Sequence, residues 1–187
     1  ADSRVEVRVS ARRVLLGITG GIAAYKACEL VRLLVRSGHE VRVVATRSAL
    51  QFVSPLTLQA LSGHPVRSEL FSLTDESEIS HIDLADWAEV FVIAPATANS
   101  MAELANGLAG DLLTTVALAT RARLVVAPAM NVHMYEHPAT QQNLATLAKR
   151  GASIVGPASG ELACGWEGEG RLVEPEQIAA AVESLLQ

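Results

Sequence analysis

Short runs of apolar residues alternate along this chain with longer segments in which apolar residues recur every three or four positions. The short runs are typical of buried parallel strands, and the longer segments are typical of amphipathic helices. The predicted strands are residues 13–18, 41–46, 66–71, 90–94, 124–127 and 153–155, and the predicted helices are residues 23–34, 55–61, 100–106, 111–120, 138–150 and 176–186. This alternation predicts a three-layer α/β domain, Rossmann- or flavodoxin-like, with a mainly parallel sheet.

Local signals mark the beginnings of two of these helices. Ser100 and Glu103 form the pattern of a capping box, which opens a helix directly after a predicted strand. Asp111 is placed to cap the next helix.

Three of the apolar runs end in the same step, in which a proline stands between two small residues. These steps are Ala94-Pro95-Ala96, Ala127-Pro128-Ala129 and Gly156-Pro157-Ala158. Proline has no N–H to give to a strand ladder, so it belongs at the end of a strand rather than inside it. Ligands of open parallel sheets bind at the carboxyl ends of strands, and we therefore expect the three ends to share one pocket.

Length and charge narrow the class of protein. The 187 residues fit one domain, and we expect residues 1–11 to be a lead-in and residues 12–187 to form that domain. The net charge of −5 and the scattered basic residues exclude a nucleic-acid partner. The two cysteines indicate a reducing compartment, and no apolar run resembles a signal peptide or is long enough to span a membrane. We expect a cytoplasmic protein.

The turn after the first strand is a candidate phosphate site. Residues 17–23, Gly-Ile-Thr-Gly-Gly-Ile-Ala, place backbone amides at the start of a helix. Thr46, Arg47 and Ser48 follow the second strand, where a dinucleotide fold has an acidic residue for a ribose. Hydroxyl groups and a cation favour a mononucleotide, with FMN as the leading candidate. The alternative is that the glycines only form the turn.

Three further segments carry candidate chemistry. Asn131 follows a strand end and can hold a carboxylate or the polar edge of a flavin without a charge of its own. His133 and His137 are four positions apart with no third ligand, so we expect no metal site.

His81 follows an acidic loop and can titrate near neutrality, although a single histidine is more often structural. Residues 159–170 are rich in glycine and predict a mobile flap that carries Cys164, whereas Cys28 is expected to be inert.

The ordered motifs of the chain resemble those of the flavin-dependent cysteine decarboxylases. The resemblance covers residues 12 to about 178 and depends on residues 19–26 (TGGIAAYK), the His81-Ile82 segment, residues 94–100 (APATANS), residues 128–134 (PAMNVHM) and residues 162–165 (LACG). The family's loop usually ends in Met-Trp, whereas this chain has Met134-Tyr135.

This resemblance implies a role for each motif. The implied FMN contacts are Gly20, Gly21, Ile22, Ala23, Thr46, Arg47, Ser48, Thr97, Ala98, Asn99, Ser100 and Ala129. The implied catalytic residues are His81 and Cys164, with Cys164 as the acid that completes the reaction. Asn131, Met130 and Ala163 are the implied substrate contacts, with Asn131 on the substrate carboxylate.

The resemblance also implies a reaction and partners. It implies decarboxylation of 4'-phosphopantothenoylcysteine to 4'-phosphopantetheine in coenzyme A biosynthesis, through a thioaldehyde and an enethiolate that is then reduced. It implies a homotrimer or a dodecamer of trimers with active sites between subunits, and possible fusion to the phosphopantothenate–cysteine ligase.

Three other functions stay open at this stage. An oxidative decarboxylase of peptides with a C-terminal cysteine would stop at the enethiol, which Cys164 argues against. A flavin prenyltransferase needs basic residues for a prenyl phosphate, and the Asn131 loop with the flap favours decarboxylation instead. A regulatory subunit that binds flavin without catalysis is less consistent with the presence of His81, Asn131 and Cys164 together.

Overall fold

A computed structural model describes residues 11–70, 81–162, 165 and 167–187. Its centre is a parallel sheet of five strands in the order β2-β1-β3-β4-β5. The strands are β1 (Arg13–Ile18), β2 (Glu40–Ala45), β3 (Val90–Ala96), β4 (Arg123–Pro128) and β5 (Ser153–Ile154). This is the flavodoxin-like strand order, which confirms the predicted fold class.

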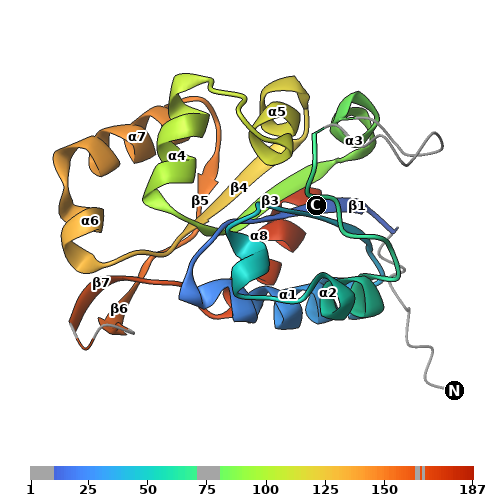
Figure 1. The fold of residues 1–187 in the computed structure, drawn as a ribbon, viewed down its shortest axis with the longest axis horizontal. Coiled ribbons are helices and arrows are strands. Elements are labelled where there is room, and N and C mark those ends of the chain that lie inside the picture. Colours follow the sequence, from blue (N-terminus) through green and yellow to red (C-terminus); the bar gives the residue numbers. More distant parts are fainter. Residues whose placement is uncertain (1–10, 71–80, 163–164, 166) are drawn as a thin grey trace, which may run out of the picture.

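Helices cover both faces of the sheet (Figure 1). One face carries α1 (Lys26–Arg36), α2 (Pro55–Ser62) and α8 (Pro175–Leu186), and the other carries α3 (His81–Trp87), α4 (Ala98–Asn106), α5 (Leu112–Ala119) and α7 (Pro138–Lys149). Alternate strand residues supply the two cores: in β1, Val14 and Leu16 join the cluster beneath α1 and α8, whereas Leu15 joins the cluster beneath α5 and α7.

Short elements occupy the carboxyl edge of the sheet and its surroundings. They are the 3-10 helices η1 (Ile22–Tyr25) and η2 (Ala49–Gln51), the helix α6 (Val132–Glu136), and an antiparallel hairpin of β6 (Ala158–Glu161) and β7 (Glu167–Arg171). The hairpin takes up much of the predicted flap, and neither it nor α3 and α6 was predicted as a regular element.

Two local predictions were wrong. The predicted strand at residues 66–71 is, in its described part, a single bridge between Val44 and Arg67, because the chain leaves β2 directly afterwards. The predicted capping box at Ser100 is also wrong, since Thr97 caps α4 and its side chain accepts a hydrogen bond from the Ser100 N–H at 3.1 Å. Thr97 takes the cap because it is the first residue after β3 with extended backbone.

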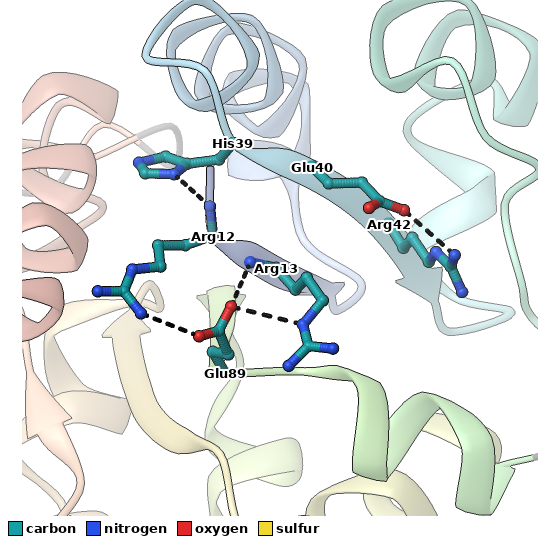
Figure 2. Close-up of polar contacts among 6 residues, drawn as sticks. All are labelled: Arg12, Arg13, His39, Glu40, Arg42 and Glu89. Carbon is teal, nitrogen blue, oxygen red and sulfur yellow. Dashed lines mark hydrogen bonds and ion pairs between the residues drawn. The ribbon is translucent and has the colours of Figure 1, made fainter. Parts of the chain in front are cut away.

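Charged side chains join the strands at the amino edge of the sheet (Figure 2). The Glu89 carboxylate accepts hydrogen bonds from the Arg13 N–H at 3.0 Å and from the Arg12 guanidinium at 3.2 Å. These bonds lower the pKa of Glu89, and the Arg13 N–H contributes most. Because Glu89 directly precedes β3, Arg12 directly precedes β1 and Arg13 begins it, these contacts join the two strands far from their carboxyl ends. In the described part of the chain, no helix is long and apolar enough to cross a membrane.

Candidate functional site

The strand order reverses between β1 and β3, and one buried hydroxyl joins the ends of these strands. The Thr19 hydroxyl donates a hydrogen bond to the Pro95 carbonyl at 2.6 Å and accepts one from the Thr97 N–H at 3.0 Å. Thr19 is only 1% exposed. Open α/β sheets bind ligands at this switch point, so Thr19 holds together the edge on which a ligand would lie. Sequence reasoning did not assign Thr19 a role, although a hydroxyl directly after a buried strand was a usable signal.

A cavity of about 990 Å³ opens at this edge. Among the described residues its lining is Gly20, Gly21, Ile22, Ala23, Tyr25, Lys26, Thr97, Ala98, Ala129, Met130, Asn131, Met134, Glu161, Leu162, Gly165, Gly170, Arg171, Leu172 and Glu174. The volume lies at the upper end of the range for ligand pockets, roughly 300–1,000 Å³. The structure therefore brings the glycine turn, the start of α4 and the Asn131 loop to one cavity.

The glycine turn forms a cradle without side chains. A Cβ added at Gly20 would lie 2.3 Å from the Cβ of Ser48, so a larger residue would push the turn and the loop after β2 apart. Gly21 has more space, because an added Cβ would lie 4.0 Å from the nearest atom, in the Thr97 side chain. Ile22 and Ala23, at the start of η1, line the cavity, and the first N–H groups of a helix have no partner within it. Such a turn fits the phosphate of a nucleotide cofactor.

The start of α4 forms the second wall. Thr97 and Ala98 line the cavity, and the Thr97 hydroxyl donates to the Ser100 hydroxyl at 3.0 Å. Ser100 is buried beneath this cap, whereas Asn99 is exposed and does not line the cavity. The small side chains of Ala98 and Ala129 leave room for a flat ring.

The segment after β2 lies beside the cavity rather than in its lining. The Thr46 hydroxyl accepts a hydrogen bond from the Ala49 N–H at 3.1 Å and so begins η2. The exposed Arg47 makes two hydrogen bonds to Glu69, at 3.2 and 2.9 Å, and this pairing raises the pKa of Arg47 and lowers that of Glu69. Two of the three residues contact the glycine turn: the Thr46 N–H donates to the Ile18 carbonyl at 3.0 Å, and Ser48 packs against Gly20.

Asn131 lines the cavity and caps α6. Its Oδ1 accepts a hydrogen bond from the His133 N–H at 2.9 Å, so a contact between Asn131 and a carboxylate would use Nδ2. The neighbouring Met130 N–H donates to the Gly170 carbonyl at 2.8 Å, which docks β7 of the hairpin on this loop. A Cβ at Gly170 would lie 2.2 Å from the Met130 carbonyl oxygen, so glycine is needed for this close approach.

Of the two predicted catalytic residues, His81 and Cys164, the structure describes only His81. His81 begins α3 and does not line the cavity, and α3 lies at the other end of the molecule from the hairpin (Figure 1). Cys164 and Ala163 lie outside the described residues. Burial raises the pKa of the Cys28 thiol, which agrees with an inert role for Cys28.

Two other expectations concern the strand ends and metals. The first two proline steps lead into the cavity through Thr97 and Ala129, but residues 156–158 do not line it, so the third step contributes only by leading into the hairpin. Among the described residues, no group of three or more His, Cys, Asp and Glu side chains is placed to hold a metal ion.

A doubly wound parallel sheet with a glycine-lined cavity at its switch point defines a nucleotide-cofactor-binding α/β protein. The chain belongs to the Flavoprotein family, whose family model matches residues 2–187. The cofactor of this class is a flavin, and the glycine cradle and small alanines of the cavity fit one.

Curated relatives and solved structures extend the similarity. The coenzyme A biosynthesis bifunctional protein CoaBC of Bacillus subtilis is 54% identical over 172 residues, which are 92% of this chain and 42% of that protein. CoaBC of Vibrio vulnificus is 50% identical over 179 residues, which are 96% of this chain and 45% of that protein. The chain thus spans less than half the length of these relatives.

Two solved structures share the fold at 35% sequence identity. A cysteine-to-serine mutant of PPC decarboxylase, complexed with pantothenoylaminoethenethiol, matches with a TM-score of 0.83 over 94% of this chain and 98% of that one. The FMN-binding protein AtHal3 matches with a TM-score of 0.80 over 94% of this chain and 97% of that one.

Proposed function

We propose that this chain binds FMN and decarboxylates 4'-phosphopantothenoylcysteine to 4'-phosphopantetheine in coenzyme A biosynthesis. The observation that carries the proposal is the convergence of the Gly20 turn, the start of α4 and the Asn131 loop on one cavity. The similarity to CoaBC proteins and to PPC decarboxylase supports the same substrate.

In this proposal the phosphate of FMN lies at the Gly20-Gly21 turn and at the start of α4, and its ring lies near Ala98 and Ala129. The loop of Thr46, Arg47 and Ser48 contributes from beside the cradle, as Ser48 already contacts Gly20. The chemistry that FMN supplies when bound is reversible hydride transfer at the cysteinyl β-carbon.

Asn131 holds the substrate carboxylate through Nδ2. Its Oδ1 is engaged by the start of α6, which fixes the orientation of the amide. A neutral amide orients the carboxylate without the strong stabilisation that a cation would give to the charge lost as carbon dioxide leaves. Met130 and Ala163 complete the substrate contacts.

Two titratable residues complete the site. Cys164 donates the proton that finishes the reaction, because a thiol with an ordinary pKa of about 8.5 is protonated near neutrality. His81 holds or deprotonates the substrate.

A second copy of the chain brings His81 to the cavity. Ile22 and Tyr25, each 62% exposed, and Met134, 49% exposed, line the cavity with large apolar surface. Such surface around a site is typical of an interface. We therefore propose a homotrimer, or a dodecamer of trimers, with active sites between subunits. The length of the CoaBC relatives also supports a partnership with the phosphopantothenate–cysteine ligase, in one chain or as a separate protein.

Mass spectrometry of the reaction product tests the proposed activity. The protein with FMN should convert 4'-phosphopantothenoylcysteine to 4'-phosphopantetheine, and Cys164→Ser should release a product lighter by two hydrogens. Cys28→Ser is the matched control and should give the normal product, since Cys28 lies in α1 among core residues. Absence of carbon dioxide release by the flavin-loaded protein would refute the activity, and release of the lighter product by the unmodified protein would favour the oxidative decarboxylase.

Complementation tests the assembly. His81→Asn and Cys164→Ser should each stop the full reaction when expressed alone. If sites form between subunits, co-expression of the two variants should restore about a quarter of the activity, as random mixing of copies predicts. No recovery in mixed oligomers would place His81 and Cys164 in the same chain's site.

A further inference from the structure

An ionic cluster on the cavity wall has no role in the proposed binding of FMN or of the reacting cysteine. Lys26 of α1 and Arg171 of β7 both donate to the same oxygen of Glu174, Oε1, at 3.1 and 2.8 Å. All three residues line the cavity. The hydrogen bond from Lys26 is the main reason why the pKa of Glu174 is lowered, so the carboxylate is charged near neutrality. Two cations therefore share one carboxylate oxygen.

Arg171 has hydrogen-bonding capacity beyond this contact. A guanidinium carries five N–H donors in a planar fork, and among the described residues Arg171 has one ion-pair partner, Glu174. The side chain is 46% exposed and lies along Gly160 of β6, where a Cβ would be 3.5 Å from Nη1. Glu174 thus holds one end of the fork, and Arg171 also lines the cavity. This arrangement is suited to an anion with several oxygens, such as a phosphate monoester.

The position of Arg171 connects it to the substrate rather than to the flavin. The Met130 N–H donates to the Gly170 carbonyl, so Arg171 follows directly after the residue docked on the Asn131 loop. The proposed flavin phosphate site lies instead at the Gly20 turn and the start of α4, at the switch point. Of the three charged residues, only Lys26 lies next to the glycine turn, at the end of η1, whereas Arg171 and Glu174 come from β7 and the start of α8.

We propose that Arg171 binds the phosphate of the substrate and gives the site its preference for phosphorylated over unphosphorylated pantothenoylcysteine. Glu174 orients the guanidinium, and Lys26 adds positive charge to the same wall. This inference rests on the proposed decarboxylase function.

Kinetics with the two substrates test it. The protein should have a higher kcat/KM for 4'-phosphopantothenoylcysteine than for pantothenoylcysteine, and Arg171→Ala should reduce that preference about tenfold, as expected for the loss of a hydrogen bond to a charged group. The loss should fall on KM for the phosphorylated substrate and leave the unphosphorylated substrate nearly unaffected. Arg171→Lys should keep part of the preference, because it keeps the charge and loses the fork.

Arg32→Ala is the matched control. Arg32 pairs with Glu29 at the same i,i+3 spacing and with nearly the same exposure, 43% against 46%, but it does not line the cavity. This variant should keep the full preference.

Three results would overturn the inference. They are an equal loss of activity on both substrates in Arg171→Ala, full activity of that variant on both substrates, and a loss of FMN binding in that variant, which would assign the guanidinium to the cofactor. Inactivity of the unmodified protein toward both substrates would contradict the proposed function itself.

Discussion

Replacement of Gly170 by alanine tests how the β6–β7 hairpin is held on the Asn131 loop. The added Cβ would lie 2.2 Å from the Met130 carbonyl oxygen, and it meets backbone rather than a side chain that can rotate away. Carbon–oxygen contacts are found at about 3.3 Å or more, so β7 and the loop must separate by about 1 Å. That movement would take the 2.8 Å bond from the Met130 N–H to the Gly170 carbonyl beyond hydrogen-bonding distance.

Gly160→Ala provides a control for backbone strain. Gly160 and Gly170 both have φ of 148°, a conformation that other residues rarely adopt, but a Cβ at Gly160 meets only the Arg171 side chain at 3.5 Å. The strain costs about 1–3 kcal/mol in either variant. Gly170→Ala should lose about 1 kcal/mol more, because the Met130 N–H also loses its hydrogen-bond partner.

Urea unfolding and amide hydrogen exchange measure these two effects. Gly170→Ala should lower the free energy of unfolding more than Gly160→Ala, and the Met130 amide should exchange faster in Gly170→Ala alone. Equal destabilisation of the two variants, with the Met130 amide still protected in both, would refute the reasoning.

Three further changes test the cradle, the switch point and the amino edge of the sheet. Gly20→Ala should weaken FMN binding by roughly 5- to 150-fold in a fluorescence titration, in line with the 1–3 kcal/mol that overpacking commonly costs, whereas Gly21→Ala should bind nearly normally; similar affinities would contradict the close approach seen at Gly20. Thr19→Val should lower the free energy of unfolding by about 2 kcal/mol, since two buried backbone groups lose their shared partner, and Thr19→Ser should recover most of it; a valine variant of normal stability would count against this role. Glu89→Gln should cost about 1 kcal/mol at neutral pH. Because the pKa of Glu89 is lowered by folding, this cost should be full above the ordinary glutamate value of about 4.3 and disappear as the pH falls through the lowered value; a cost that grows toward acid pH would contradict it.

The sheet was predictable because its strands are buried on both faces. A run such as residues 90–94 is apolar throughout and has the length of a strand, so pattern alone identifies it. The predicted strand at residues 66–71 failed because a short apolar run does not reveal how many backbone partners it will find. The Arg67 N–H donates to the Val43 carbonyl and the Arg67 carbonyl accepts from the Ala45 N–H. After this one residue the chain leaves β2.

The hairpin was beyond pattern reasoning for a different reason. Gly160, Gly168 and Gly170 have no side chains, so β6 and β7 show no alternation of apolar and polar residues. Their pairing is stabilised by contacts with the Asn131 loop, and this loop is distant from the hairpin in the sequence.

The candidate site was predictable in part by the same logic. Residues after β1, β3 and β4 meet because parallel strands end at one edge, and this brings Gly20, Thr97 and Asn131 to one cavity. The contact between Lys26 and Glu174 joins residues 148 positions apart, and no local signal indicates it. The separation of α3 from the cavity likewise depends on how the helices pack, and no local signal in the sequence indicates it.

A crystal structure of the protein with FMN tests the central claim most directly. We predict that the phosphate lies on the Gly20-Gly21 turn and that the ring lies beside Ala129 with Asn131 at its edge. An FMN molecule bound elsewhere on the protein, or a cavity that stays empty at saturating FMN, would contradict the account.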